Sequence, residues 1–138
     1  MIEITIPGNP TTKKNSRENR KARNKRTGKI YHYQAASKAF TKYQEDAAAA
    51  LVIPPSLKDK FPIDYPVNVK SIYYRKNLVR CDLSNLHEAT DDILVHYGIL
   101  KDDNFKIVAG HDGSRVRIDR ENPRTEITIT KMEDLEND

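Results

Sequence analysis

Apolar residues at helical spacing, framed by residues that start and stop helices, constrain the fold of this chain most strongly. Intervals of three or four residues join the apolar positions Leu86, Ala89, Ile93, Leu94 and Tyr97. This spacing places them on one face of a helix, predicted from about Ser84 to Tyr97. Asp82 or Ser84 suits the start of the helix, and Gly98 suits the left-handed position just past its end.

The stretch from Arg80 to Asn104 that contains this helix is rich in acids, although the chain has a formal net charge of +4. Its six carboxylates belong to Asp82, Glu88, Asp91, Asp92, Asp102 and Asp103. On the predicted helix, Ser84 and Glu88, followed by Asp91 and Asp92, are three to four residues apart and share a face. Acids concentrated in this way repel one another unless they face water or surround a cation.

Asp102 and Asp103 follow the apolar pair Ile99–Leu100, which is expected to return the chain toward a sheet. The helix start, the helix face and the next strand edge then present oxygens to one point. Carboxylates without a paired Cys/His set suit a hard cation such as Mg2+ or Mn2+. The alternative remains open that these residues are an N-cap, a turn and a solvated helix face, which are common roles for acids.

The 138 residues predict one domain, 1–138, with a sizeable core. A basic balance indicates a polyanionic partner without naming it. The single cysteine, Cys81, excludes a disulfide within one chain and a cysteine-based zinc cluster, and a packing role is favoured over a nucleophile. The N-terminus does not resemble a signal peptide, and no segment has the length of a membrane span. A cytoplasmic protein is expected.

A basic arm of about residues 11–30 follows a predicted strand at residues 2–6 and the turn Pro7–Gly8. Only Glu18 interrupts its lysines and arginines, so the arm cannot pack into a core. It is interpreted either as a solvated or disordered loop or as a phosphate-binding segment. A turn is predicted within Asn24–Gly28, and Tyr31 and Tyr33 are candidates to stack on an unpaired base.

The remaining pattern predicts a helix from Ser37 to about Val52, a polar connection from Ser56 to Tyr65, and a strand from Pro66 to Tyr74. Further strands are predicted at 105–109, 115–118 and 125–131, with a break at 110–113, a hairpin connection at 121–124 and a loose acidic tail at 133–138. This order predicts an α+β fold, with a mixed, largely antiparallel sheet and two main helices packed on it.

Several motifs along the chain match one family. They are P-x-T-K-K-N-S at 10–16, S-K-A-F-x-x-Y at 37–43, D-L-S-N-L at 82–86, D-x-L at 92–94, glycine at 98, D-D at 102–103 and E-I-T-I-T at 126–130. The chain resembles RusA-type Holliday-junction resolvases, small phage-derived endonucleases that cut four-way DNA junctions. The resemblance covers nearly the whole chain. It implies a RusA-like homodimer that makes paired nicks in recombination and DNA repair, with Mg2+ held by aspartates.

The family pattern D-L-D-N and the later Asp pair place functional aspartates at Asp82 and Asp103. The pattern's second aspartate is Ser84 here, and a lysine common in the family four residues further on is Glu88. Glu88 lies one helical turn from Ser84, so it is expected to supply the missing carboxylate. Asp82, Glu88 and Asp103 are thus the expected metal ligands and catalytic residues, with Ser84, Asp92 and Asp102 as further ligands or supporting groups.

The expected DNA-binding residues are basic or polar and lie in the arm and directly before Asp82. They are Lys13, Lys14, Asn15, Arg17, Arg75, Lys76 and Arg80. His87 and His96 are candidate bases, although both are placed on an exposed helix face. A second hypothesis remains open, in which the site is degenerate at Ser84 and the protein binds DNA without cutting it.

Overall fold

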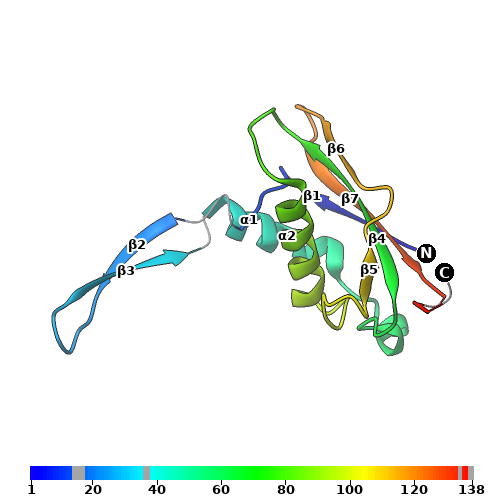
Figure 1. Cartoon of the computed structure of the whole chain (residues 1–138), viewed down its shortest axis with the longest axis horizontal. Coiled ribbons are helices and arrows are strands. Elements are labelled where there is room, and N and C mark those ends of the chain that lie inside the picture. The colour runs from blue at the N-terminus through cyan, green and yellow to red at the C-terminus, as the bar shows by residue number, and fades with distance from the viewer. Residues whose placement is uncertain (14–17, 36–37, 134, 137–138) are drawn as a thin grey trace.

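The computed structural model describes residues 1–13, 18–35, 38–133 and 135–136. A mixed sheet and two helices form the body of the molecule, and a two-stranded hairpin projects from it (Figure 1). The strands are β1 (Ile2–Pro7), β2 (Glu18–Arg23), β3 (Ile30–Ala35), β4 (Val67–Arg75), β5 (Val108–Gly110), β6 (Arg115–Ile118) and β7 (Arg124–Lys131). The α-helices are α1 (Lys38–Asp46) and α2 (Leu83–His96), and the 3-10 helices are η1 (Ala48–Leu51) and η2 (Pro55–Lys60).

The main sheet has five strands in the order β1-β7-β4, with β5 and β6 following one another along the far edge of β4. The β1–β7 and β7–β4 pairs are antiparallel, whereas β5 and β6 run parallel to β4. On β4 the side chains of Val67, Val69, Ser71 and Tyr73 are buried and those between them are more exposed, as the alternation predicts. The predicted α+β class with a mixed, largely antiparallel sheet is confirmed.

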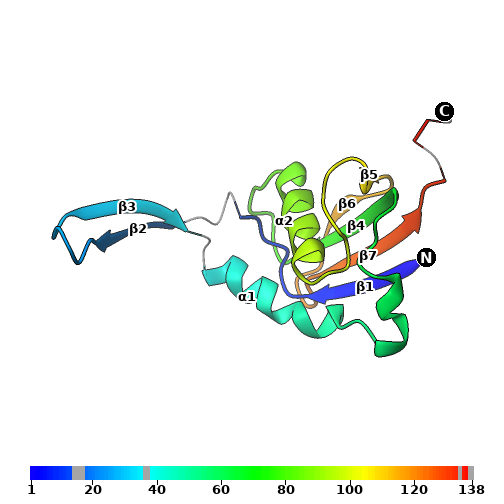
Figure 2. The same ribbon diagram turned by 90° about the horizontal axis from the view of Figure 1, so that it is seen from below.

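Both helices pack on one face of this sheet, so the core lies between a helix layer and a sheet layer (Figure 2). One contiguous cluster joins Phe40 and Tyr43 of α1 with Ile93 and Leu94 of α2. Its sheet side consists of Ile6, Val67, Val69, Ile127 and Ile129. Burial of these alternating aliphatic positions on one face is the main source of stability for such a fold.

Helix α2 matches its predicted limits closely. Asp82 occupies the N-cap position with an extended backbone, and Gly98 adopts φ +76° just past the helix. A side chain at Gly98 would be strained in that left-handed conformation, which accounts for glycine there. The helix predicted from Ser37 to Val52 is divided instead. Helix α1 ends at Asp46, and η1 continues the turn to Leu51, after which Val52 is extended before Pro54.

The connections differ more from prediction than the elements do. The hairpin predicted at 121–124 is wrong, because β6 and β7 pair with opposite edges of β4 and do not pair with each other. The predicted strand at 105–109 begins only at Val108. The segment predicted as a polar connection contains η2 and the fully buried Ile63, which forms a parallel bridge to Leu100. Alternation within a strand does not specify which strand lies beside it.

From Glu18 onward the basic arm forms β2 and the turn of a β-hairpin with β3, so the interpretation of this part as a loop is wrong. The predicted turn is present: the Gly28 N–H donates to the Asn24 carbonyl at 2.8 Å, and Gly28 has φ +74°. The Asn24 side chain also accepts hydrogen bonds from the N–H groups of Arg26 and Thr27. Within the described residues, neither strand of this hairpin pairs with the main sheet.

Candidate metal centre and nucleic-acid interface

The outward face of α2 carries a row of oxygen-bearing side chains. Ser84, Glu88 and Asp92 are spaced by four residues, and the first two are exposed while Asp92 is half-buried. Asp91 was predicted to share this face. Instead, it points toward the sheet and is only 6 % exposed. One residue of an α-helix corresponds to about 100° of rotation, so neighbours 91 and 92 face different surroundings.

Asp92 and Asp103 come into electrostatic contact beside this row. The pKa of Asp103 is raised, first by partial burial, then by its hydrogen bond with Asp102 and by the charge of Asp92. The Lys13 ammonium lies 3.0 Å from a carboxylate oxygen of Asp92. Two acids from separate segments therefore lie near enough for their charges to interact, and a cation already accompanies Asp92.

The carboxylate of Asp102 forms its hydrogen bonds within its own loop. It accepts the Asp103 N–H at 2.7 Å and the Asn104 amide at 3.1 Å. These hydrogen bonds, with that of the Asp103 N–H largest, lower the pKa of Asp102. Asp102 therefore shapes the loop that presents Asp103.

Asp82 is exposed at the N-terminus of α2, ten residues before Asp92. That separation corresponds to about 15 Å along the helix axis, so Asp82 and Asp92 lie toward opposite ends of the row. Glu88 is exposed between them. Within the described residues, no three His, Cys, Asp or Glu side chains gather closely enough to hold a metal ion.

The donor chemistry nevertheless fits a hard divalent cation. The groups present are carboxylates and one hydroxyl, which Mg2+ and Mn2+ accept as ligands. The raised pKa of Asp103 beside Asp92 marks a place where added positive charge is favourable. Asp92 and Asp103 would hold such an ion first, with Glu88 one helical turn from Asp92.

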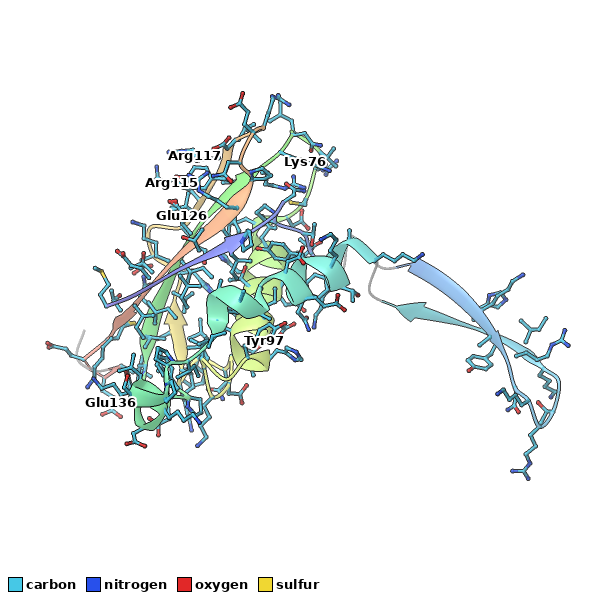
Figure 3. The ribbon with its side chains drawn as sticks, turned by 180° about the vertical axis from the view of Figure 1, so that it is seen from behind. Lys76, Tyr97, Arg115, Arg117, Glu126 and Glu136 are labelled. Atoms are coloured by element: carbon cyan, nitrogen blue, oxygen red, sulfur yellow. The ribbon has the colours of Figure 1, made fainter. Side chains whose placement is uncertain are left out.

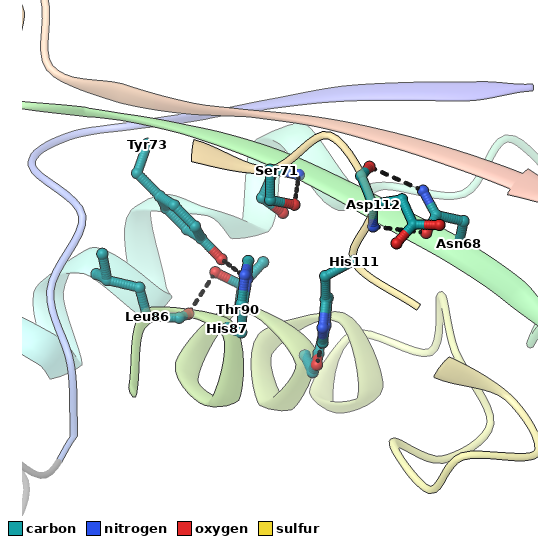
Figure 4. A network of polar contacts seen from close by, with 10 residues as sticks. Asn68, Ser71, Tyr73, Leu86, His87, Thr90, His111 and Asp112 are labelled. Atoms are coloured by element: carbon teal, nitrogen blue, oxygen red, sulfur yellow. Dashed lines mark hydrogen bonds and ion pairs between the residues drawn. The ribbon is translucent and has the colours of Figure 1, made fainter. Parts of the chain in front are cut away.

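A polar network lies between α2 and the sheet (Figure 4). Tyr73 Oη and His87 Nδ1 share a hydrogen bond of 2.8 Å, and the His87 ring stacks on His111 with centroids 4.1 Å apart. His111 Nε2 lies 2.9 Å from Asp91 Oδ2. The prediction that His87 lies on an exposed face of the helix is therefore wrong. Its pKa is lowered to about 4, first by burial and then by His111. His96 is exposed, as expected.

Positive side chains gather at the end of the sheet where β4 leads toward α2. Arg115 and Arg117 of β6 and the loop residue Lys76 lie toward the same end of the sheet (Figure 3). The two arginines pair with Ile72 and Tyr74 of β4, so their side chains face away from α2. The Arg75 guanidinium donates to the carbonyl of Val79, which closes the loop. A shallow pocket of about 250 Å3 separates that loop from β6, and Arg75, Arg80, Leu83, Val116 and Ile118 are among its lining residues.

Three of the expected DNA-binding residues, Lys14, Asn15 and Arg17, lie outside the described residues. Sequence reasoning missed Arg115 and Arg117, although their alternation with Val116 and Ile118 was visible in the chain. It also missed Tyr73 and His111. No spacing rule joins these two residues to α2, because their contacts depend on tertiary packing.

The α+β body, the row of carboxylates and the neighbouring cations define a class of protein that acts on phosphodiesters. A family model for the endodeoxyribonuclease RusA matches residues 7–130 of the 138-residue chain. The chain belongs to the RusA endodeoxyribonuclease family and is an endodeoxyribonuclease. Membership implies activity on Holliday junctions and a dependence on metal ions. A search of curated proteins finds no match. Among the described residues, no helix is long and apolar enough to cross a membrane.

Proposed function

We propose that this protein is a Mg2+-dependent endodeoxyribonuclease that resolves four-way DNA junctions by paired nicks, in recombination and repair. Mn2+ is expected to substitute for Mg2+. The observation that carries the proposal is the match of residues 7–130 to the RusA family. It is supported by Asp92 on the open face of α2, whose charge helps to raise the pKa of Asp103 in the following loop. The positively charged end of the sheet supplies a surface suited to DNA.

Glu88, Asp92 and Asp103 are proposed as carboxylates for one metal ion, because the charge of Asp92 acts on Asp103. Asp82 lies about 15 Å from Asp92 along the axis of α2, so it is proposed to bind a second ion. The bound ion would lower the pKa of a water molecule and offset charge on the phosphodiester. Ser84 offers only a neutral hydroxyl, so Glu88 is proposed to supply the negative charge that a second aspartate provides in the family pattern. Asp102 keeps the loop carrying Asp103 in place through its hydrogen bonds.

The DNA backbone is proposed to lie along the cations near these acids. Lys13 places a positive charge 3.0 Å from Asp92, and Arg75, Lys76 and Arg80 precede Asp82 in the chain. Arg115 and Arg117 carry positive charge on the opposite face of the sheet, because they pair with Ile72 and Tyr74 of β4, and they are not included in this surface. Lys14, Asn15 and Arg17 remain proposed contacts from the sequence alone. Each neutralised phosphate releases counterions, so binding should weaken steeply with salt.

Paired nicks require two active sites related by symmetry. A four-way junction presents equivalent strands about a two-fold axis, and a homodimer with a two-fold axis presents equivalent sites. We therefore propose that the acting species is a homodimer.

Nicking of a synthetic four-way junction by Asp103→Asn and Asp82→Asn tests the assignment. Each variant should lose at least about 100-fold in nicking rate, as expected for loss of a metal ligand, and should retain junction binding in a gel-shift assay. Glu88→Gln should lose activity comparably if Glu88 replaces the missing carboxylate. Asp59→Asn, an exposed acid on η2, is the matched control and should act as the parent.

Three outcomes would change this proposal. Parental nicking by Asp103→Asn or Asp82→Asn would remove that residue from the site, and parental nicking by Glu88→Gln would remove only the replacement idea. Junction binding by the parent without nicking at any Mg2+ or Mn2+ concentration would instead indicate a non-cleaving DNA-binding protein.

A further inference from the structure

We propose that the buried polar network of Tyr73, His87, His111 and Asp91 positions the carboxylates Glu88 and Asp92 by fixing the rotation of α2. The inference rests on the proposed function, because it assigns these four residues a role toward the metal-binding face. The four side chains form one connected line: hydroxyl, ring, ring and carboxylate. They come from β4, α2 and the loop between β5 and β6.

The arrangement on α2 couples the network to the open face. His87 and Asp91 are one turn apart on the inner side, and each is followed directly by a proposed metal-binding residue, Glu88 and Asp92. Both pairs share the same rigid turn of backbone. A rotation of the helix that moved His87 and Asp91 from their partners would therefore move Glu88 and Asp92 by the same angle.

The network adds directional restraints to the close packing that already places the apolar face of α2 against the sheet. Ala89, Ile93 and Leu94 join the core through contacts that lack directional preference. The Tyr73–His87 hydrogen bond and the 2.9 Å contact of His111 with Asp91 are directional. The two imidazole rings are also stacked nearly parallel, with 2° between their planes. Tyr73 points from the sheet and His111 from the loop, so α2 is held from two directions (Figure 4).

The loop that carries His111 is itself fixed to β4. The Asn68 side chain donates to the Asp112 carbonyl at 3.1 Å and accepts the Asp112 N–H at 2.8 Å. The Ser71 N–H donates to the Ser114 hydroxyl at 2.9 Å. A Cβ added at Gly110 would lie 2.9 Å from Asn68 Oδ1, so only glycine permits this close approach without a shift. His111 is therefore a fixed anchor for the helix.

Burying this polar network costs folding free energy, because its side chains lose contact with water. Asp91 is 6 % exposed and its Oδ1 has no hydrogen-bond partner among the described residues. Burial raises the pKa of Asp91 and lowers that of His87. Apolar side chains would fill the same space without these desolvation costs. The directional restraint on Glu88 and Asp92 gives the network a use that apolar packing would not provide.

Tyr73→Phe tests this role because it removes one hydroxyl and leaves the ring. The matched control is Tyr43→Phe, which also removes a buried hydroxyl, bonded to Thr125 at 2.6 Å, but from α1. Mn2+ binding without DNA is measured by electron paramagnetic resonance, and thermal unfolding is measured in parallel. Tyr73→Phe should raise the Mn2+ dissociation constant about three- to tenfold, while Tyr43→Phe should leave it within about twofold of the parent.

A second pair of variants covers the case in which Tyr73→Phe fails to fold. His111→Ala should weaken Mn2+ binding, and His111→Gln, whose amide can still donate to Asp91, should restore part of it. Equal Mn2+ affinity in the parent, Tyr73→Phe and His111→Ala would overturn the positioning role. Equal weakening by Tyr73→Phe and Tyr43→Phe would also overturn it, since lost stability would then explain the effect. Absence of Mn2+ binding and nicking in the parent would contradict the proposed function itself.

Discussion

The positive charge of Lys13 affects the two proposed binding activities, metal binding and DNA binding, in opposite directions. Its ammonium lies 3.0 Å from Asp92 and 5.5 Å from the centroid of the Phe40 ring. It thereby connects the start of the basic arm to both helices. A positive charge beside Asp92 favours nearby DNA phosphate but opposes a metal ion on the same carboxylate.

Lys13→Met should therefore change metal and DNA binding in opposite directions. Mn2+ should bind more tightly in the absence of DNA, because the cation beside Asp92 is gone. Junction binding should weaken, and the slope of its logarithmic salt dependence should fall by about one. Lys42→Met, which removes a lysine from an ion pair with Asp46 on α1, is the control and should change neither measurement. Weaker Mn2+ binding by Lys13→Met would contradict this account.

Among the elements, the β2–β3 hairpin is built for contact with a polyanion. It carries the cations Lys21, Arg23, Lys25, Arg26 and Lys29, and no acid occurs between Glu18 and Glu45. Ile30 and Tyr31 are 55 % and 52 % exposed, although they belong to a strand. A two-stranded ribbon in isolation is marginally stable in water and has dimensions that fit the major groove of DNA.

Neutralising the hairpin should reduce DNA binding without unfolding the body. Replacing Arg23, Lys25 and Arg26 together by Gln should weaken junction binding and lower its logarithmic salt slope by about three. The melting temperature should remain close to that of the parent, because within the described residues the hairpin does not pair with the main sheet. The matched control replaces Lys42, Lys58 and Lys60, which removes the same charge from α1 and η2. An equal loss of binding in both triple variants would indicate a general effect of net charge.

For the molecule as a whole, the apolar core lies apart from the proposed metal site. The cluster joining α1, α2 and the sheet does not include the proposed metal-binding carboxylates, which lie on the outer face of α2 and the adjacent loop. Metal binding and folding are therefore expected to be largely independent, unlike in small domains that need a metal to fold.

Removing divalent ions should stop nicking and preserve the fold. With a chelator, the circular dichroism spectrum and melting temperature should stay near those of the untreated protein, and junction binding should persist. In analytical ultracentrifugation, the mass should be twice the 15.9 kDa of one chain, with or without chelator. Unfolding on chelation would show that the ion is structural, and a monomeric mass during paired nicking would contradict the proposed homodimer.

The sequence by itself determined the elements that depend on local patterns. The apolar spacing from Leu86 to Tyr97, with Asp82 before it and Gly98 after it, specified α2, because helix periodicity and end residues act within a few turns. Alternation specified β1, β4 and β7 in the same way. The family motifs in the chain indicated the RusA family, and the family model confirms it.

Only the tertiary structure decided which of these elements are neighbours. It placed β6 and β7 on opposite sides of β4, formed a hairpin from the basic arm, and brought Asp92 to Asp103. It also turned Asp91 and His87 inward to meet His111 and Tyr73. The physical reason is that such contacts join residues distant in sequence, so packing geometry selects them and local periodicity carries no record of the partner.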